Sequence, residues 1–177
     1  MALQQAAFSL RMMERRDART VAALIRSAFA SQFVVTDPPP SALRVTEEEI
    51  AAHLRVGGGA VAEAGGGMVG SALWNEQDDG LYLGRLAVEP AWRGRGIAKA
   101  LVASAEAAAR RMALPRVHLS TRLVLRDNRR LFAACGFVET TCHAHPGYRE
   151  PTFVNMEKRL VPVPPPPGPL SPGQAEF

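Results

Sequence analysis

The sequence predicts a mixed α/β domain with a mostly antiparallel sheet, and three patterns support this. Two strand-like runs, 60–63 and 68–74, flank three successive glycines, as in an antiparallel hairpin. Apolar residues recur at helical spacing over 21–29 and 97–112. A loop rich in glycine and arginine precedes the second of these helices.

Length and composition indicate one globular domain. The chain has 177 residues, of which 47% are hydrophobic and 21% are charged, enough for one core. The net charge of +4 is dispersed, so no nucleic-acid partner is expected. No apolar run approaches the about 18 residues that span a membrane. The two cysteines and the lack of a secretion signal favour a cytoplasmic location.

The first half of the chain is expected to begin with a strand over 8–13. Asp17 is placed to cap the helix that follows. The segment 31–45 contains three successive prolines and is expected to be a loop. Thr46 and Glu49 then form a capping-box pattern, which predicts the start of a second helix.

The second half alternates strands and helices. Strands are expected over 81–88, 116–121 and 152–158, with a short helix over 128–135 between the last two. The whole predicted order is one strand, two helices, three strands, a helix, a strand, a helix and two strands. Prolines dominate 161–177, so we expect one domain over residues 1–160 followed by a disordered tail.

The strongest functional pattern is a strand that runs into a glycine-containing loop and then a helix. Glycines let backbone N–H groups approach one ligand, and the positive end of the helix dipole adds to the field there, so a pyrophosphate is the expected ligand. Lys99 stands where a dinucleotide fingerprint has its third small residue, which argues against that motif. The residues that carry the pattern are Leu86, Ala87, Val88, Arg93, Gly94, Arg95, Gly96, Ile97 and Ala98.

Leu86-Ala87-Val88-x-Pro90 followed by Arg93-x-x-Gly96-x-Ala98 resembles the acyl-CoA motif of the GNAT superfamily of N-acetyltransferases. The segment 128–137 is similar to the short helix and Gly-Phe ending that flank the CoA thiol in that family. The resemblance implies a strongly bent, mostly antiparallel mixed sheet flanked by helices on both faces. It also implies acetyl transfer from acetyl-CoA, as co-substrate, to a primary amine of a small molecule, peptide or protein.

The same resemblance implies roles for single residues. The backbone of Leu86 to Val88 would pair with the pantetheine arm, in a gap where this strand parts from strand 116–121. The amides from Arg93 to Ala98 would hold the pyrophosphate. The two guanidinium groups of that loop would add charge-assisted contacts, or else are solvated surface groups. Asn128 would lie beside the pantetheine.

The proton-transfer residues depart from the family pattern. Phe132 stands where many relatives have the tyrosine that protonates the departing thiolate, so it keeps a packing role beside the thiol and has no proton to give. Ser120 stands where N-terminal acetylases often have a glutamate base. Tyr148 is our hypothetical replacement acid, with a rim aromatic as the alternative. Ser120 and Tyr148 are therefore the candidate catalytic residues.

The histidines give no separate function. Cys142, His143 and His145 are too close together for a metal site without a second ligand pair, so no metal is expected. We interpret His118 as structural, and expect His53 to face solvent.

The predicted reaction is direct attack of a neutral amine on the thioester in a ternary complex, because no nucleophile with a neighbouring base is evident. A catalytically weak acyl-CoA-binding or regulatory module is the alternative, motivated by Phe132 and Ser120. A nucleic-acid binder is the less favoured third hypothesis. The chain is expected to be a monomer or a homodimer.

Overall fold

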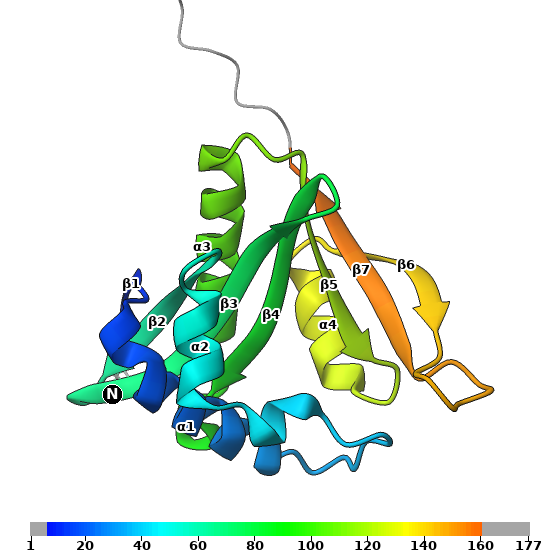
Figure 1. Ribbon diagram of the computed structural model, residues 1–177, viewed down its shortest axis with the longest axis horizontal. Helices are drawn as coiled ribbons and strands as arrows, with labels where there is room; N and C mark the ends of the chain where they lie inside the picture. The colour runs from blue at the N-terminus through cyan, green and yellow to red at the C-terminus, as the bar shows by residue number, and fades with distance from the viewer. Residues whose placement is uncertain (1–6, 161–177) are drawn as a thin grey trace, which may run out of the picture.

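A sheet of seven strands, in the order β1-β2-β3-β4-β5-β7-β6, forms the centre of the molecule (Figure 1). The structure is a computed structural model and describes residues 7–160. Its strands are β1 (Ser9–Met12), β2 (Gly58–Ala64), β3 (Gly67–Gln77), β4 (Gly80–Val88), β5 (Arg116–Arg122), β6 (Val138–His143) and β7 (Phe153–Arg159). Its α-helices are α1 (Ala18–Ala30), α2 (Glu47–His53), α3 (Ile97–Arg111) and α4 (Arg126–Ala134), and its 3-10 turns are η1 (Arg15–Asp17), η2 (Ser41–Arg44) and η3 (Pro90–Trp92).

The order of strands and α-helices agrees with the sequence prediction. The capping box that opens α2 is present, because Thr46 accepts a bond from the Glu49 N–H and the Glu49 carboxylate accepts one from the Thr46 N–H. The hairpin between β2 and β3 turns at Gly65 and Gly66, which both have positive φ. The predicted loop over 31–45 contains η2.

Two local expectations are wrong. Asp17 stands at the N-cap position of α1, but its side chain makes no capping bond to that helix, because its carboxylate accepts from Arg11 and from the Glu14 N–H, each at 2.7 Å. His53 does not face solvent. Its Nε2 lies 3.2 Å from the carbonyl oxygen of Gly58 and 3.1 Å from that of Trp74, so the ring joins the end of α2 to the sheet.

Alternating side chains of the central strands serve two cores, one on each face of the sheet. Ala72 and Trp74 pack with α3 and with the region of α4. Leu73, between them in sequence, packs with α1 and α2 on the opposite face. Helices therefore flank both faces, as the predicted fold class requires.

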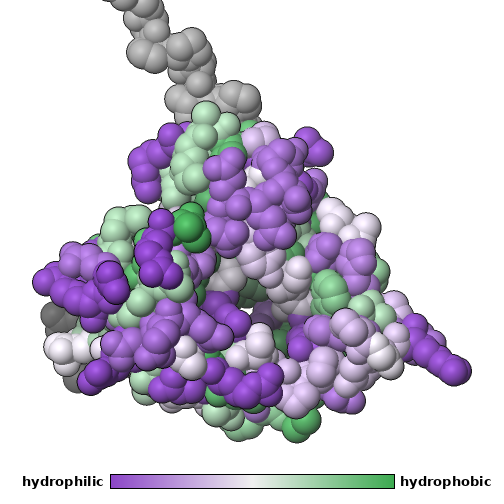
Figure 2. Space-filling view, viewed as in Figure 1, coloured by the Kyte–Doolittle hydropathy of each residue, from purple (hydrophilic) through white to green (hydrophobic). Residues whose placement is uncertain are grey.

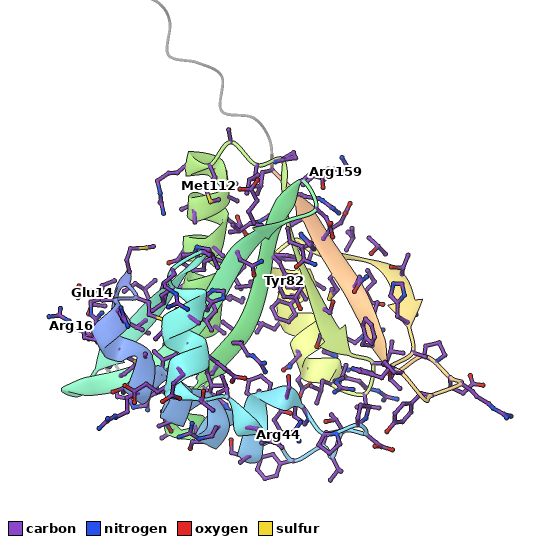
Figure 3. All side chains as sticks on the ribbon, in the orientation of Figure 1. Glu14, Arg16, Arg44, Tyr82, Met112 and Arg159 are labelled. Atoms are coloured by element: carbon purple, nitrogen blue, oxygen red, sulfur yellow. The ribbon has the colours of Figure 1, made fainter. Side chains whose placement is uncertain are left out.

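The only parallel pairing in the described sheet joins β4 to β5, and it is short. Its register contains Leu81 opposite Val117 and Tyr82 opposite His118. Beyond these pairs the two strands separate, with α4 lying in the opening (Figure 1). Tyr82, labelled in Figure 3, marks the place where they part. The opening is the feature that positions the site.

Several expectations stay predictions. The tail over 161–177 lies outside the described residues. Within residues 7–160, no helix is both long and apolar enough to cross a membrane. The location in the cell and the oligomeric state are likewise predictions only.

Candidate acyl-transfer site

The separation of β4 from β5 exposes a strand edge inside the molecule. β4 is paired with β3 along its length, but its other edge loses its partner after Tyr82. Backbone N–H and C=O groups on that edge must find other partners. An extended ligand with amide groups can supply them in the manner of an added strand. The gap expected between these strands is thus present.

A β-bulge lies on β4 within this opening. The register with β3 shifts between Ser71 opposite Ala87 and Leu73 opposite Gly84. Arg85, inside the shift, has a φ of 50°, which is uncommon for a residue other than glycine. A bulge bends the strand and re-aims its side chains, as is frequent beside functional sites.

A cavity of about 860 Å³, which we call the larger cavity, runs from the end of β4 to α4. It contains ten of the eleven predicted cofactor residues, and the exception is Arg95. Three cations that the sequence pattern did not indicate as site residues also line it: Lys99, Arg126 and Arg130. The predicted residues along it are Leu86, Ala87, Val88, Arg93, Gly94, Gly96, Ile97, Ala98, Asn128 and Phe132.

The glycine loop gives the larger cavity an anion-binding end. Gly94 and Gly96 have φ values of 74° and 83°, a conformation that glycine adopts at little cost. Gly96 is the residue before α3, and no side chain caps the helix. The N–H groups of the first turn precede the first intrahelical bond, from Ala100 N to Gly96 O at 3.0 Å. These free donors and the helix dipole favour a phosphate group.

The two arginines of the loop are engaged with the protein itself. Arg93 donates from Nε to the carbonyl of Val88 at 3.2 Å, and from Nη2 to the carbonyl of Ala28 at 3.0 Å. It therefore joins α1 to the end of β4, although the residue is exposed. Arg95 stacks over Trp92, with Cζ 4.7 Å from the ring centroid, and lies outside the larger cavity.

A smaller cavity, of about 370 Å³, is lined by residues of both parted strands, 82–86 of β4 and 119–122 of β5. Figure 2 shows the surface hollowed near the centre of this face. Phe132 is 7% exposed and packs edge-to-face on Phe137, which agrees with the packing role expected for it. The two cavities meet at six residues that line both of them: Phe29, Gln32, Leu86, Leu125, Asn128 and Phe132.

The structure separates the two candidate catalytic residues. Ser120 lines the smaller cavity, and its Oγ donates to Oδ1 of Asn155 at 2.7 Å. Tyr148 lines neither cavity. Its hydroxyl donates to the carboxylate of Asp37, and this bond is the main reason that the pKa of Tyr148 is raised. The hydroxyl thus connects the loop after β6 to the loop after α1.

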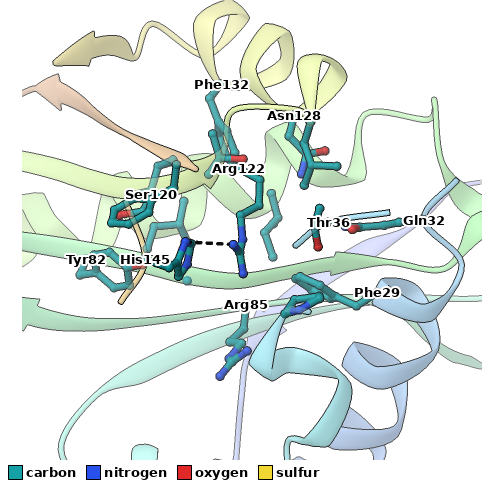
Figure 4. Close-up of a pocket in the computed structure, with 18 residues that line it drawn as sticks. Phe29, Gln32, Thr36, Tyr82, Arg85, Ser120, Arg122, Asn128, Phe132 and His145 are labelled. Atoms are coloured by element: carbon teal, nitrogen blue, oxygen red, sulfur yellow. Dashed lines mark hydrogen bonds between the residues drawn. The ribbon is translucent and has the colours of Figure 1, made fainter. Parts of the chain in front are cut away.

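Arg122 and His145 form a pair in the smaller cavity. The Nη1 of Arg122 donates to Nδ1 of His145 at 3.1 Å (Figure 4). Burial, followed by the charge of Arg122, lowers the pKa of His145, so the imidazole is neutral near pH 7. Nδ1 also lies within hydrogen-bond distance of the Thr152 hydroxyl. Since Arg122 can only donate, Nδ1 accepts from it and the ring proton is placed on Nε2. Among residues 7–160, no group of three or more His, Cys, Asp or Glu side chains could hold a metal ion.

The sequence model of the Acetyltransferase (GNAT) family matches residues 22–137, more than half of the chain. The chain belongs to this family. Acetyl transfer from acetyl-CoA is therefore its reaction class, and the predicted resemblance, enzyme class and co-substrate are confirmed. A comparison with curated proteins gave no significant match.

Solved acetyltransferase structures share the fold at low sequence identity. The ribosomal-protein-S18-alanine N-acetyltransferase from Escherichia coli has a TM-score of 0.70 and 16% identity, over 90% of this chain and 97% of its own. YncA from Salmonella typhimurium, a putative acetyltransferase solved with acetyl-CoA, has a TM-score of 0.68 and 17% identity, over 92% of this chain and 99% of its own. The PaiA N-acetyltransferase from Thermoplasma acidophilum, solved with coenzyme A, has a TM-score of 0.71 and 16% identity, over 87% of this chain and 99% of its own.

Sequence reasoning missed two residues of this GNAT site for different reasons. Arg122 is two residues beyond Ser120 on β5, and side chains two apart on a strand share a face, so period two could have placed it in the cavity. His145 was weighed only as a metal ligand. Its approach to Arg122 depends on the path of the loop before β7, for which the sequence has no comparable signal.

Proposed function

We propose that this GNAT acetyltransferase moves the acetyl group by direct attack of a primary amine on acetyl-CoA, with both substrates bound at once. The observation that carries the proposal is the shared boundary of the two cavities at Asn128 and Phe132. A thioester held there from the larger cavity would be open to an amine that enters from the smaller one. Holding the two reactants together converts the attack into an effectively unimolecular step.

The cofactor is proposed to lie along the larger cavity. The pyrophosphate would accept from the free amides of the first turn of α3, and Lys99, Arg126 and Arg130 would add positive charge beside it. The pantetheine arm would follow the open edge of β4 toward Phe132. A backbone N–H of that edge could then polarise the thioester carbonyl, where charge develops during attack.

The residues of the smaller cavity favour attack by an amine that arrives neutral. Nδ1 of His145 is occupied by Arg122, so its lone pair is not free to take a proton from the amine. Ser120 donates its own proton to the amide oxygen of Asn155, which is too weak a base to activate it. Phe132 has no proton for the departing thiolate. We therefore propose that water completes the proton transfers.

The test is a thiol-release assay with acetyl-CoA and a panel of primary amines, followed by mass spectrometry of each amine. We expect free CoA and acetylated amine to form in equal amounts. A protein that binds acetyl-CoA but releases no thiol above the uncatalysed rate, with any amine, would support the acyl-CoA-binding module instead.

A further inference from the structure

A cation without an ionic partner lies in the smaller cavity. Arg122, the last residue of β5, has no carboxylate oxygen of the described residues within 4.0 Å, and bonds only to the neutral ring of His145. Arg116, the first residue of the same strand, differs. It pairs with Glu157 at 2.8 Å and with Asp79 at 2.7 Å.

Burial makes this isolated charge unfavourable. Removal of water lowers the pKa of Arg122, and the more distant Tyr148 and Asp37 act in the opposite direction. The imidazole of His145 satisfies one N–H group without neutralising the charge, and further N–H donors of the guanidinium remain. An anion that enters the cavity would supply the missing partner.

The rest of the smaller cavity has the same electrostatic character. Within residues 7–160, no Asp or Glu side chain lines it. A second cation, Arg85, lines it from the bulge of β4, and its one hydrogen bond in the described residues goes from Nη2 to the hydroxyl of Ser41 at 3.1 Å. Arg85 and Arg122 thus come from β4 and β5, the two strands that border the opening. Both charged residues that line the cavity are cations, which favours an acceptor with a negative group over a bare ammonium.

We propose that the acceptor is a small amine that carries a carboxylate, a free amino acid or a compound of that size, with the carboxylate bound by Arg122. The planar guanidinium matches a carboxylate with two parallel bonds, which a single ammonium cannot do. The cavity volume of about 370 Å³ is suited to a small molecule. This inference rests on the proposed function, because it assumes that the smaller cavity receives the acceptor.

The experiment compares three forms of each amine skeleton: the amino acid, its methyl ester and the decarboxylated amine. Short peptides with acidic side chains test whether the carboxylate belongs to a larger acceptor. We expect kcat/KM for the acid to exceed that for the ester by about 10- to 100-fold, the usual effect of hydrogen bonds to a charged group. Arg122→Gln should lower kcat/KM for the acid to about that for the ester, so that the acid-to-ester ratio falls to about 1. Arg122→Lys should retain part of it.

Arg149→Gln is the matched control. Arg149 is an exposed arginine on the loop that contains His145, and it lines neither cavity. The acid-to-ester ratio should be unchanged in Arg149→Gln. If Arg122 had only a structural role, Arg122→Gln would slow the acid and the ester alike and would also leave this ratio unchanged. Calorimetry with the N-acetylated amino acid and CoA should show binding that Arg122→Gln abolishes.

The two proposals fail in different ways. Equal rates with acid and ester, a ratio that survives Arg122→Gln, or a preference for acidic peptides over free amino acids would overturn the inference and leave acetyl transfer intact. Binding of the acids that depends on Arg122, without thiol release, would support the carboxylate site and contradict the transfer reaction.

Discussion

Replacing Gly96 by alanine separates the conformational strain of the glycine loop from its role in binding. Gly96 has a φ of 83°, and a Cβ added there would meet no atom of the described chain within 4 Å. The left-handed conformation costs alanine about 1–2 kcal/mol. For a domain of this size that lowers Tm by about 2–8 °C. No atom of the described chain occupies the space that the new methyl group would enter. A loss of acetyl-CoA affinity in a variant that still folds would therefore report on a ligand that occupies this space.

Gly66 provides a matched control. It has a φ of 79° in the turn between β2 and β3, a Cβ there would also meet no atom within 4 Å, and it lines neither cavity. Gly66→Ala and Gly96→Ala should lower Tm by similar amounts in thermal denaturation. Only Gly96→Ala should weaken acetyl-CoA binding, by about 10-fold or more in calorimetry, through loss of charge-assisted bonds to phosphate. Wild-type affinity in a folded Gly96→Ala protein would refute the assignment of the loop.

Three further substitutions test particular contacts. Because the Tyr148 hydroxyl bonds to Asp37, Tyr148→Phe should raise the acceptor KM in steady-state assays, and a fall in kcat of about 10²-fold would instead establish Tyr148 as the acid. The bond from Arg11 lowers the pKa of Asp17 in the folded state. The ion pair therefore stabilises the fold fully at pH values above the pKa of Asp17 in the unfolded chain, and this stabilisation is lost as the pH falls through the lower pKa of the folded state. Asp17→Asn should therefore lower Tm by about 2–6 °C at neutral pH, with a difference from wild type that shrinks below about pH 4, and a constant difference would contradict this. Arg93→Met should lower Tm by about 2–8 °C, because the carbonyls of Val88 and Ala28 lose their donor. An unchanged Tm would show that these two bonds do not stabilise the fold.

The parts of the molecule that the sequence predicted well depend on local patterns. The capping box at Thr46, the turn at Gly65 and Gly66, and the glycine loop before α3 are each specified by residues close in sequence. Helical spacing of apolar residues placed α1 and α3 because each helix must bury one stripe against the sheet. Most residues predicted to bind the cofactor line one cavity, since most of them belong to one continuous segment.

The acceptor side could not be predicted in the same way, because its contacts join distant segments. Tyr148 meets Asp37 across 111 positions in the sequence, and Arg93 meets Ala28 across 65. Long-range pairing also decides whether a charged side chain is satisfied. Arg116 and Arg122 end the same strand, yet only the fold shows which of them has an ionic partner.

The central claim is that the two cavities hold both substrates at once beside Asn128 and Phe132. Initial-rate kinetics test it most directly, with acetyl-CoA and the best amine of the panel varied together. Direct transfer predicts intersecting double-reciprocal lines and no burst of CoA in the absence of amine. Parallel lines, together with an acetyl group on the protein detected by mass spectrometry before amine is added, would contradict the account.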